Sequence, residues 1–376
     1  MIDKINIRGY RSLKDFHMEG CSRFNILVGP NNTGKSSLLE ALFLHCAPAN
    51  ASIIFSILTS RGGSFRLSPE HIVYHTKWLF SAPLHSDDVP TLTISSQWKN
   101  YNRKTTLSLI PGAIEVDHLA PQSISGGTHG TSGVTPIVLP PMNLRKKNEP
   151  VLILGTIKSS FESDNQNLVE DILEVISGEM KIEGPRIKTD IPASLVHQTS
   201  HKEPGIVDIS QATLGNLFEK AMVLLRDIDP DIEDIRILSL GGDVPEVFVK
   251  SRKIGSAPFN ILGDGLKRIS HIAFRLSHSQ NGILLIDEFE NSIDKNALRL
   301  TTDWIFRAAK KNNTQIFLTT HSLECLDTIL ETKSFVAKDF SLFRMRREQN
   351  DVFCKRIPGD KVKDIRFELG QEIRWS

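Results

Sequence analysis

Near its start the chain reads Phe24-Asn25-Ile26-Leu27-Val28-Gly29-Pro30-Asn31-Asn32-Thr33-Gly34-Lys35-Ser36. The run Phe24 to Val28 has the length and composition of a buried strand, and residues 36–44 have helical composition and spacing. The loop between them fits the pattern G-x-x-x-x-G-K-[ST], the P-loop that holds phosphate groups. A strand, this loop and a helix in that order predict an α/β fold with a nucleotide site. The alternative is a glycine-rich turn that binds no ligand. The flanking strand and helix disfavour this alternative.

The residue types in this loop suit phosphate chemistry. Small residues let successive backbone N–H groups converge on a phosphate, and the helix that starts near Gly34 adds its positive N-terminal end. Lys35 supplies a mobile cation for the β- and γ-phosphates, and the Ser36 hydroxyl is suited to bind Mg²⁺. We therefore expect ATP and Mg²⁺ here. The other residues expected to bind the nucleotide are Asn31, Asn32, Thr33, Gly34 and Ser37.

A second strand is expected to end in two adjacent carboxylates. Residues 282–286 are a near-continuous apolar run, as in a parallel sheet covered on both faces, and Asp287 and Glu288 follow them. Asp287 is placed to join the shell of the Mg²⁺ ion. Glu288 is suited to accept a proton from an attacking water molecule or to orient it. The alternative, a strand that runs out into solvent, is disfavoured by the P-loop in the same chain.

A histidine follows a third apolar strand. Residues 315–319 lead into Thr320-His321-Ser322. His321 is a candidate to contact the γ-phosphate or to position the water, although a histidine at the end of a strand is often purely structural.

A glycine turn opens a helix between the P-loop and the acidic pair. Gly263-Asp264-Gly265 begins it, and its N-terminus could face a phosphate. N-capping by Asp264 is the simpler alternative. Lys267 and Arg268 follow the turn, where they would either reach a γ-phosphate on another subunit or cover the helix surface.

The order of these motifs resembles that of the ABC-type ATPases. Within them, the segments IRGYRSLKDF, GPNNTGKSSLLEAL, GDGLKRI, LLIDEFENSID and TTHS resemble the RecF-like and overcoming-lysogenisation-defect (OLD) ATPases, over residues 1–46 and 260–325. The resemblance implies an α/β, ABC-type P-loop ATPase head, a mixed sheet with flanking helices, plus an antiparallel β and helical insertion. It also implies a head-to-tail homodimer with ATP between the protomers.

The resemblance assigns the motifs as follows. Residues 29–36 are the Walker A loop, Asp287 and Glu288 the Walker B pair, and residues 263–265 the signature turn, without the Leu-Ser-Gly-Gly-Gln wording of transporters. Residues 291–294 correspond to the D-loop, and His321 to the switch histidine. Gln97 is the candidate for the Q-loop glutamine.

The expected domains follow from the motif positions. Residues 1–46 and 260–335 form the ATPase core, residues 47–259 a β-rich lobe and helical insertion, and residues 336–376 strands that close the core. Within the insertion, residues 91–95 and 106–110 alternate as antiparallel strands do. Helices are expected around Asn167–Ile176 and Leu214–Leu225, and residues 123–136 form a Gly/Ser/Thr-rich loop.

Composition excludes some classes of protein. The 45 Lys and Arg against 44 Asp and Glu give a net charge of +1, which argues against a generally basic nucleic-acid coat protein. No signal peptide or apolar run of membrane-spanning length occurs, and four scattered cysteines fit reduced thiols, so we expect a cytoplasmic protein.

Weaker patterns leave two binding possibilities. DNA contact is possible through the basic clusters Arg145–Lys147 and Arg344, Arg346 and Arg347. His197 and His201 have i,i+4 spacing but no evident third ligand, so a zinc site is disfavoured.

The expected function follows from the resemblance. OLD nucleases carry a C-terminal nuclease domain, but only 55 residues follow His321 here. We expect an ATPase switch that controls a separate effector, a nuclease or toxin, in bacterial antiviral defence or DNA maintenance. The alternative is an ATP-bound scaffold or sensor that assembles such a partner without hydrolysis.

Overall fold

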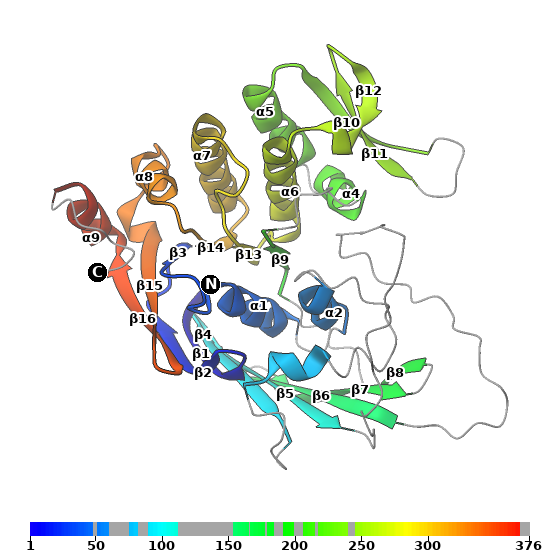
Figure 1. Cartoon of the computed structure of the whole chain (residues 1–376), viewed down its shortest axis with the longest axis vertical. Coiled ribbons are helices and arrows are strands. Elements are labelled where there is room, and N and C mark those ends of the chain that lie inside the picture. Colours follow the sequence, from blue (N-terminus) through cyan, green and yellow to red (C-terminus); the bar gives the residue numbers. More distant parts are fainter. Residues whose placement is uncertain are drawn as a thin grey trace.

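The computed structural model describes residues 1–47, 51–59, 75–81, 89–111, 153–164, 166–176, 179–183, 191–198, 206–214, 217–239 and 245–368. These residues form layers (Figure 1): an antiparallel sheet at the bottom of the view, helix α1 above it, a mixed sheet across the middle and a group of helices at the top. The fold class is therefore the one predicted, an α/β P-loop ATPase fold whose mixed sheet has flanking helices.

The central sheet has six strands. Its order is β16 (Asp351–Pro358), β15 (Phe340–Glu348), β3 (Phe24–Val28), β14 (Gln315–Thr319), β13 (Ile283–Ile286) and β9 (Ala193–Val196). The β15–β16 hairpin is antiparallel, and the pairs from β15 to β9 are parallel. The strands β3, β13 and β14 are buried along their whole length, which explains their continuous apolar runs.

A second, antiparallel sheet has seven strands. Its order is β2 (Leu13–Glu19), β1 (Ile2–Tyr10), β4 (Thr91–Trp98), β5 (Asn102–Pro111), β6 (Ile153–Ser163), β7 (Gln166–Ile176) and β8 (Glu179–Glu183). Ile5 and Ile7 of β1 are buried, whereas Lys4 and Asn6 are exposed. This alternation shows that one face of the sheet covers the core and the other meets solvent.

Helix α1 (Lys35–Cys46) lies between the two sheets, and α2 (Ala51–Thr59) follows it (Figure 1). One hydrophobic cluster joins Ile5 of the antiparallel sheet, Leu39 of α1, and Leu285 and Phe317 of the central sheet. Because both sheets bury α1, it needs no polar face. The P-loop at its N-terminus is thereby attached to the centre of the molecule.

The other face of the central sheet carries helices and a small sheet. The helices are α4 (Ile206–Leu214), α5 (Phe218–Ile228), α6 (Asp264–His278), α7 (Lys295–Lys311) and α8 (Leu323–Glu331). The small sheet contains β10 (Ile232–Leu238), β11 (Glu246–Ser251) and β12 (Gly255–Pro258). Helix α9 (Gly359–Lys363) follows β16, and short helical turns are η1 (Lys77–Leu79), η2 (Phe259–Ile261), η3 (Ala337–Asp339) and η4 (Asp364–Glu368).

One prediction of secondary structure is wrong, and another is confirmed with different bounds. Residues 167–176, predicted as a helix, form β7, which pairs with β6 on one side and β8 on the other. These residues mix apolar and acidic side chains in a pattern that fits either period, and hydrogen bonding to two neighbouring strands decides between them. The helix predicted around Leu214–Leu225 is present as α5, with different bounds: α4 ends at Leu214, and α5 begins at Phe218 and continues to Ile228.

Strand pairing also crosses the expected domain boundaries. Residues 193–196, placed in the insertion, form β9 of the central sheet. The strands β1 and β2, placed in the ATPase core, share a sheet with β4 to β8. The loop at residues 123–136 lies outside the described residues. None of the helices in the described ranges is both long and apolar enough to cross a membrane.

Candidate functional site

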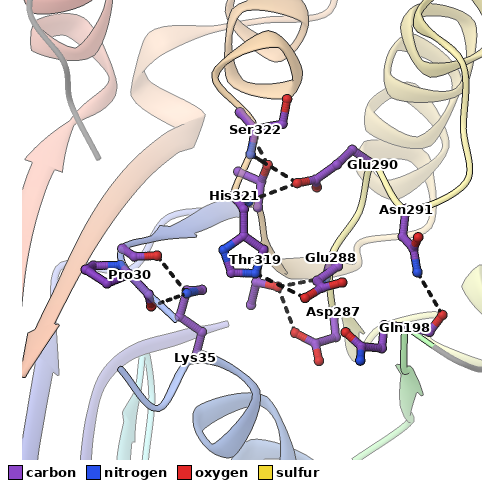
Figure 2. Close-up of polar contacts among 12 residues, drawn as sticks. Pro30, Lys35, Gln198, Asp287, Glu288, Glu290, Asn291, Thr319, His321 and Ser322 are labelled. Carbon is purple, nitrogen blue, oxygen red and sulfur yellow. Dashed lines mark hydrogen bonds and ion pairs between the residues drawn. The ribbon is translucent and has the colours of Figure 1, made fainter. Parts of the chain in front are cut away.

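The carboxyl ends of four parallel strands meet at one edge of the central sheet. There β3 leads into the P-loop, β13 into Asp287 and Glu288, β14 into Thr320-His321-Ser322, and β9 into His197 and Gln198. Figure 2 shows side chains from these segments close together. In open α/β sheets, ligands bind outside this edge.

The P-loop has a conformation that requires glycine at both ends. Gly29 has a φ of 144°, and a Cβ atom there would collide with the Met345 carbonyl oxygen of β15. Gly34 has a φ of 83°, and a Cβ atom there would be 3.1 Å from Ser12 Oγ in the turn between β1 and β2. Between them, Thr33 Oγ1 donates to the Pro30 carbonyl at 2.9 Å.

Asn31 to Ser37 of the predicted nucleotide-binding residues lie on this loop and the first turn of α1, whereas Gly263, Asp264 and Gly265 lie at the start of α6. Asn31 and Asn32 are exposed, Ser36 is partly buried, and Thr33, Lys35 and Ser37 are buried. The exposed end of the loop is thus positioned to meet a ligand, while its other residues anchor it to the core.

Lys35 is held by its own loop. Its Nζ donates to the carbonyl oxygens of Gly29 at 2.8 Å and Pro30 at 2.7 Å (Figure 2). Burial lowers the pKa of Lys35 to about 8, although the carboxylates of Asp287, Glu288 and Glu290 act to raise it. The amino group is therefore a cation at neutral pH that titrates just above it.

Thr319, the last residue of β14, ties the acidic pair together. Its Oγ1 donates to Asp287 Oδ1 at 2.8 Å and accepts a hydrogen bond from the Glu288 N–H at 2.7 Å. Glu288 has a φ of 47°, in the left-handed region that non-glycine residues seldom occupy. The hydroxyl of Thr319 helps to hold Glu288 in this conformation, a role that sequence reasoning missed because a threonine at a strand end is unremarkable.

The Glu288 carboxylate meets two side chains from other strands. His321 Nε2 lies 3.1 Å from Glu288 Oε1 (Figure 2). Gln198, which follows β9, has its side-chain nitrogen 2.9 Å from Oε1 and 2.7 Å from Oε2 when its amide is turned to donate. The structure therefore brings together Glu288 and His321, and it adds Gln198.

Gln97 does not lie at this site. It is an exposed residue of β4, where it pairs with Lys4 in the antiparallel sheet. Gln198 lies at the site instead, and its backbone carbonyl also accepts a hydrogen bond from Asn291 Nδ2 at 3.1 Å. Its signal in the sequence was weak, because four residues of strand do not stand out beside the longer apolar runs.

The glycine turn at residues 263–265 is partly exposed and packs on the D-loop segment. A Cβ atom on Gly265 would be 2.5 Å from the Ser292 carbonyl oxygen, so glycine is required for this contact. Asp264 forms an ion pair with Lys267, at 2.7 Å, and no side-chain capping bond is made at the start of α6. The side chain of Lys267 is only 13% exposed.

Arg268 neither reaches toward another subunit nor covers the helix surface, which corrects both expectations for this residue. It is fully buried, and its guanidinium donates to the carbonyl oxygens of His197 and Asp287, the latter at 2.5 Å. Burial lowers the pKa of Arg268 to about 10, although Asp287, Glu288 and Glu290 raise it. Arg268 thus ties the start of α6 to the ends of β9 and β13.

The donor set fits a nucleotide with Mg²⁺. Asp287 Oδ1 accepts a hydrogen bond from Thr319, and the Asp287 carboxylate lies on the same sheet edge as the P-loop. The Asp287 carboxylate and the Ser36 hydroxyl could therefore hold the ion. Among the described residues, no three His, Cys, Asp or Glu side chains are grouped to bind a metal. His201 of the disfavoured zinc pair lies outside the described residues, and His197 is buried.

The basic residues of β15 remain a prediction for DNA contact. Arg344 is partly buried, and Arg346 and Arg347 are exposed. Arg346 forms an ion pair with Glu348 at 3.1 Å. The cluster Arg145–Lys147 lies outside the described ranges. All four cysteines are free thiols, as expected.

Two family models match the chain. One, described as an AAA ATPase domain, matches residues 1–77. The other, whose description joins an AAA domain to the AbiEii toxin of a type IV TA system, matches residues 143–327. The chain is therefore similar to ATPases of the AAA/ABC type.

Two individual relatives and one solved structure share between 11% and 35% of their residues with this chain over the matched regions. An ATP/GTP phosphatase of Helicobacter pylori is 24% identical over 381 residues, which cover 96% of this chain and 97% of that protein. An uncharacterized protein of Methanocaldococcus jannaschii, MJECL11, is 35% identical over 113 residues, or 30% of this chain and 99% of that protein. An SMC head domain from Thermotoga maritima covers 95% of this chain and 98% of its own, at 11% identity and a TM-score of 0.41.

Proposed function

We propose that the protein binds ATP with Mg²⁺, hydrolyses it and uses this cycle as a switch. The observation that carries the proposal is the setting of Glu288, whose carboxylate meets the imidazole of His321 and the amide of Gln198 at the sheet edge that also carries the P-loop. A loop that only binds phosphate needs no carboxylate placed in this way. The name of the Helicobacter pylori relative, ATP/GTP phosphatase, supports hydrolysis.

Each residue has a task in this proposal. The N–H groups of the P-loop and Lys35 bind the phosphates, while Ser36 and Asp287 hold Mg²⁺, which neutralises charge on the phosphate oxygens. Glu288 accepts a proton from the attacking water molecule. His321 and Gln198 keep the carboxylate in place and orient the water. Thr319 holds the backbone from which Glu288 projects.

We also propose that two copies join head to tail, so that the turn at residues 263–265 of one completes the phosphate site of the other. In support, Gly263 and Asp264 are exposed, and a Cβ atom on Gly263 would meet no atom within 4 Å. The resulting dimer is closed and two-fold symmetric.

We propose further that the switch controls a separate effector, a nuclease or toxin, in bacterial antiviral defence or DNA maintenance. Support comes from the second family model, whose description names the AbiEii toxin and a type IV TA system. The motif order that resembles RecF-like and OLD ATPases points the same way.

Phosphate release tests the hydrolytic function. Purified wild type and Glu288→Gln are compared with ATP and with GTP, in Mg²⁺ and in EDTA. We expect the variant to lower kcat about a hundredfold or more, because a general base contributes at least that factor, while nucleotide binding persists. Equal release by both proteins would contradict hydrolysis at this site and favour the scaffold or sensor alternative.

A further inference from the structure

Glu290 holds the segment that carries His321. Its Oε1 atom accepts hydrogen bonds from the backbone N–H groups of His321, at 2.9 Å, and Ser322, at 3.1 Å (Figure 2). Glu290 is partly buried and lies two residues beyond Glu288. One carboxylate oxygen that accepts two successive N–H groups makes a charge-assisted anchor for that backbone.

These bonds complete a ladder between the loops that follow β13 and β14. Lower on the ladder, Thr319 binds Asp287 and Glu288, and the Phe289 N–H donates to the Thr319 carbonyl at 3.0 Å. His321 is consequently held at both ends. Glu290 binds its backbone, and Glu288 binds its imidazole.

Starting helix α8 does not by itself require Glu290. Ser322 is the N-cap residue, and its side chain accepts a hydrogen bond from the Cys325 N–H at 3.1 Å. The bond from His321 to Glu290 lies ahead of the cap. Glu290 also binds the Ser322 N–H and the Cys325 side chain at the start of α8, but its bond to the His321 N–H is the one that positions His321.

We propose that Glu290 is a positioning residue for hydrolysis, which keeps the imidazole of His321 on Glu288 by binding the N–H groups of His321 and Ser322. This inference rests on the proposed hydrolytic function. It requires that Glu290 act through His321, without touching the nucleotide itself.

Steady-state kinetics test this role. We expect Glu290→Ala to lower kcat about tenfold, with KM for Mg-ATP within about twofold of wild type, because the lost bonds orient a catalytic group and do not bind substrate. Glu290→Gln keeps a carbonyl oxygen in the same place and should restore most of the rate. Glu324→Gln is the matched control, since Glu324 is an exposed carboxylate on α8 paired with Lys295, and it should keep the wild-type kcat.

A double variant separates this role from others. If Glu290 acts through His321, then His321→Ala combined with Glu290→Ala should have the kcat of His321→Ala alone, within about twofold. Losses that multiply in the double variant would overturn the proposal, as would a raised KM with unchanged kcat. If Glu290→Ala does not fold, Glu290→Asp replaces it in the same comparison, because its side chain is one methylene shorter and its carboxylate lies farther from the two N–H groups.

The ring signals of His321 distinguish failure of this proposal from failure of the proposed function. In protein with labelled histidine and without nucleotide, His321→Ala assigns the signal among the 12 histidines. We expect Glu290→Ala to shift it to that of a ring without a carboxylate partner, and Glu324→Gln to leave it unchanged. An unchanged signal in Glu290→Ala overturns the positioning role. Absence of phosphate release by wild type would instead refute hydrolysis.

Discussion

At the residue scale, the cations of the site depend on carboxylates that come from other parts of the chain. Burial lowers the pKa of Lys35 and of Arg268, and in both cases Asp287, Glu288 and Glu290 act in the opposite direction. The two cations differ in access. Lys35 lies on the loop that would meet a ligand, whereas the Arg268 guanidinium is enclosed by carbonyl oxygens.

Lys35 should make nucleotide binding depend on pH. Its pKa of about 8 means that the free protein loses this charge as pH rises past 8, whereas phosphates bind the charged form. We expect the affinity for ATP to fall about twofold from pH 7 to 8 and to weaken more steeply above pH 8, by up to about tenfold per pH unit. Fluorescent-nucleotide titrations from pH 7 to 9.5 measure this.

The matched control for this prediction is Lys35→Arg. A guanidinium stays charged over this whole pH range. We therefore expect the variant to bind ATP more weakly than wild type at neutral pH, with an affinity that does not change as the pH rises. A wild-type affinity that stays level up to pH 9.5 would contradict the lowered pKa.

At the element scale, α6 is the helix through which the parts of the site are connected. Arg268 joins its first turns to the ends of β9 and β13, and Gly265 packs on the D-loop segment. Further along, Asp208 of α4 forms an ion pair with Arg275, at 3.2 Å, and its carboxylate lies 3.3 Å from His278 Nε2. Asp208 and Arg275 are both buried, so this pair links α4 to α6 within the core.

Removing the charge of Asp208 should destabilise the protein strongly. Asp208→Asn leaves Arg275 buried beside a neutral side chain, and loss of one partner of a buried pair costs about 3–5 kcal/mol. Urea denaturation measures the free energy of unfolding. Glu19→Gln, which breaks the exposed pair between Lys4 and Glu19, is the control and should cost about 1 kcal/mol or less. Equal losses in the two variants would refute the linking role of Asp208.

At the scale of the whole molecule, both surfaces that the proposed composite site needs lie among the described residues. The P-loop carries exposed Asn31 and Asn32, and the turn at Gly263 and Asp264 is exposed as well. The central sheet attaches the P-loop through β3 and α1, and α6 attaches the turn (Figure 1). A change at one of these surfaces can therefore test dimerisation without disturbing the core.

We expect ATP with Mg²⁺ to convert Glu288→Gln from a 42.1 kDa monomer into a dimer of twice that mass, measured by light scattering, because the variant binds ATP and hydrolyses it only slowly. Adding Gly263→Trp should abolish the dimer while nucleotide binding remains. The open space around Gly263, with its ordinary backbone φ of −61°, lets the chain itself accept this side chain. A mass independent of ATP would remove the composite-site proposal.

Much of the site could be predicted from sequence because its motifs are contiguous. The P-loop, the acidic pair and His321 each follow an apolar run whose type is evident from neighbouring residues. Gln198, Thr319 and Glu290 could not be found in this way. Each acts through a hydrogen bond to a segment between 31 and 90 residues away in the chain, and no local pattern records such a bond.

The sequence by itself determined that strands, a phosphate loop and a carboxylate pair exist, since hydrophobic runs and glycines act over a few residues. Tertiary structure alone decided which strands are neighbours. In the tertiary structure residues 167–176 pair as a strand, β9 belongs to the central sheet, and Arg268 is buried. The physical reason is that pairing and burial are set by partners distant in sequence, and these determine which polar atoms must be hydrogen-bonded.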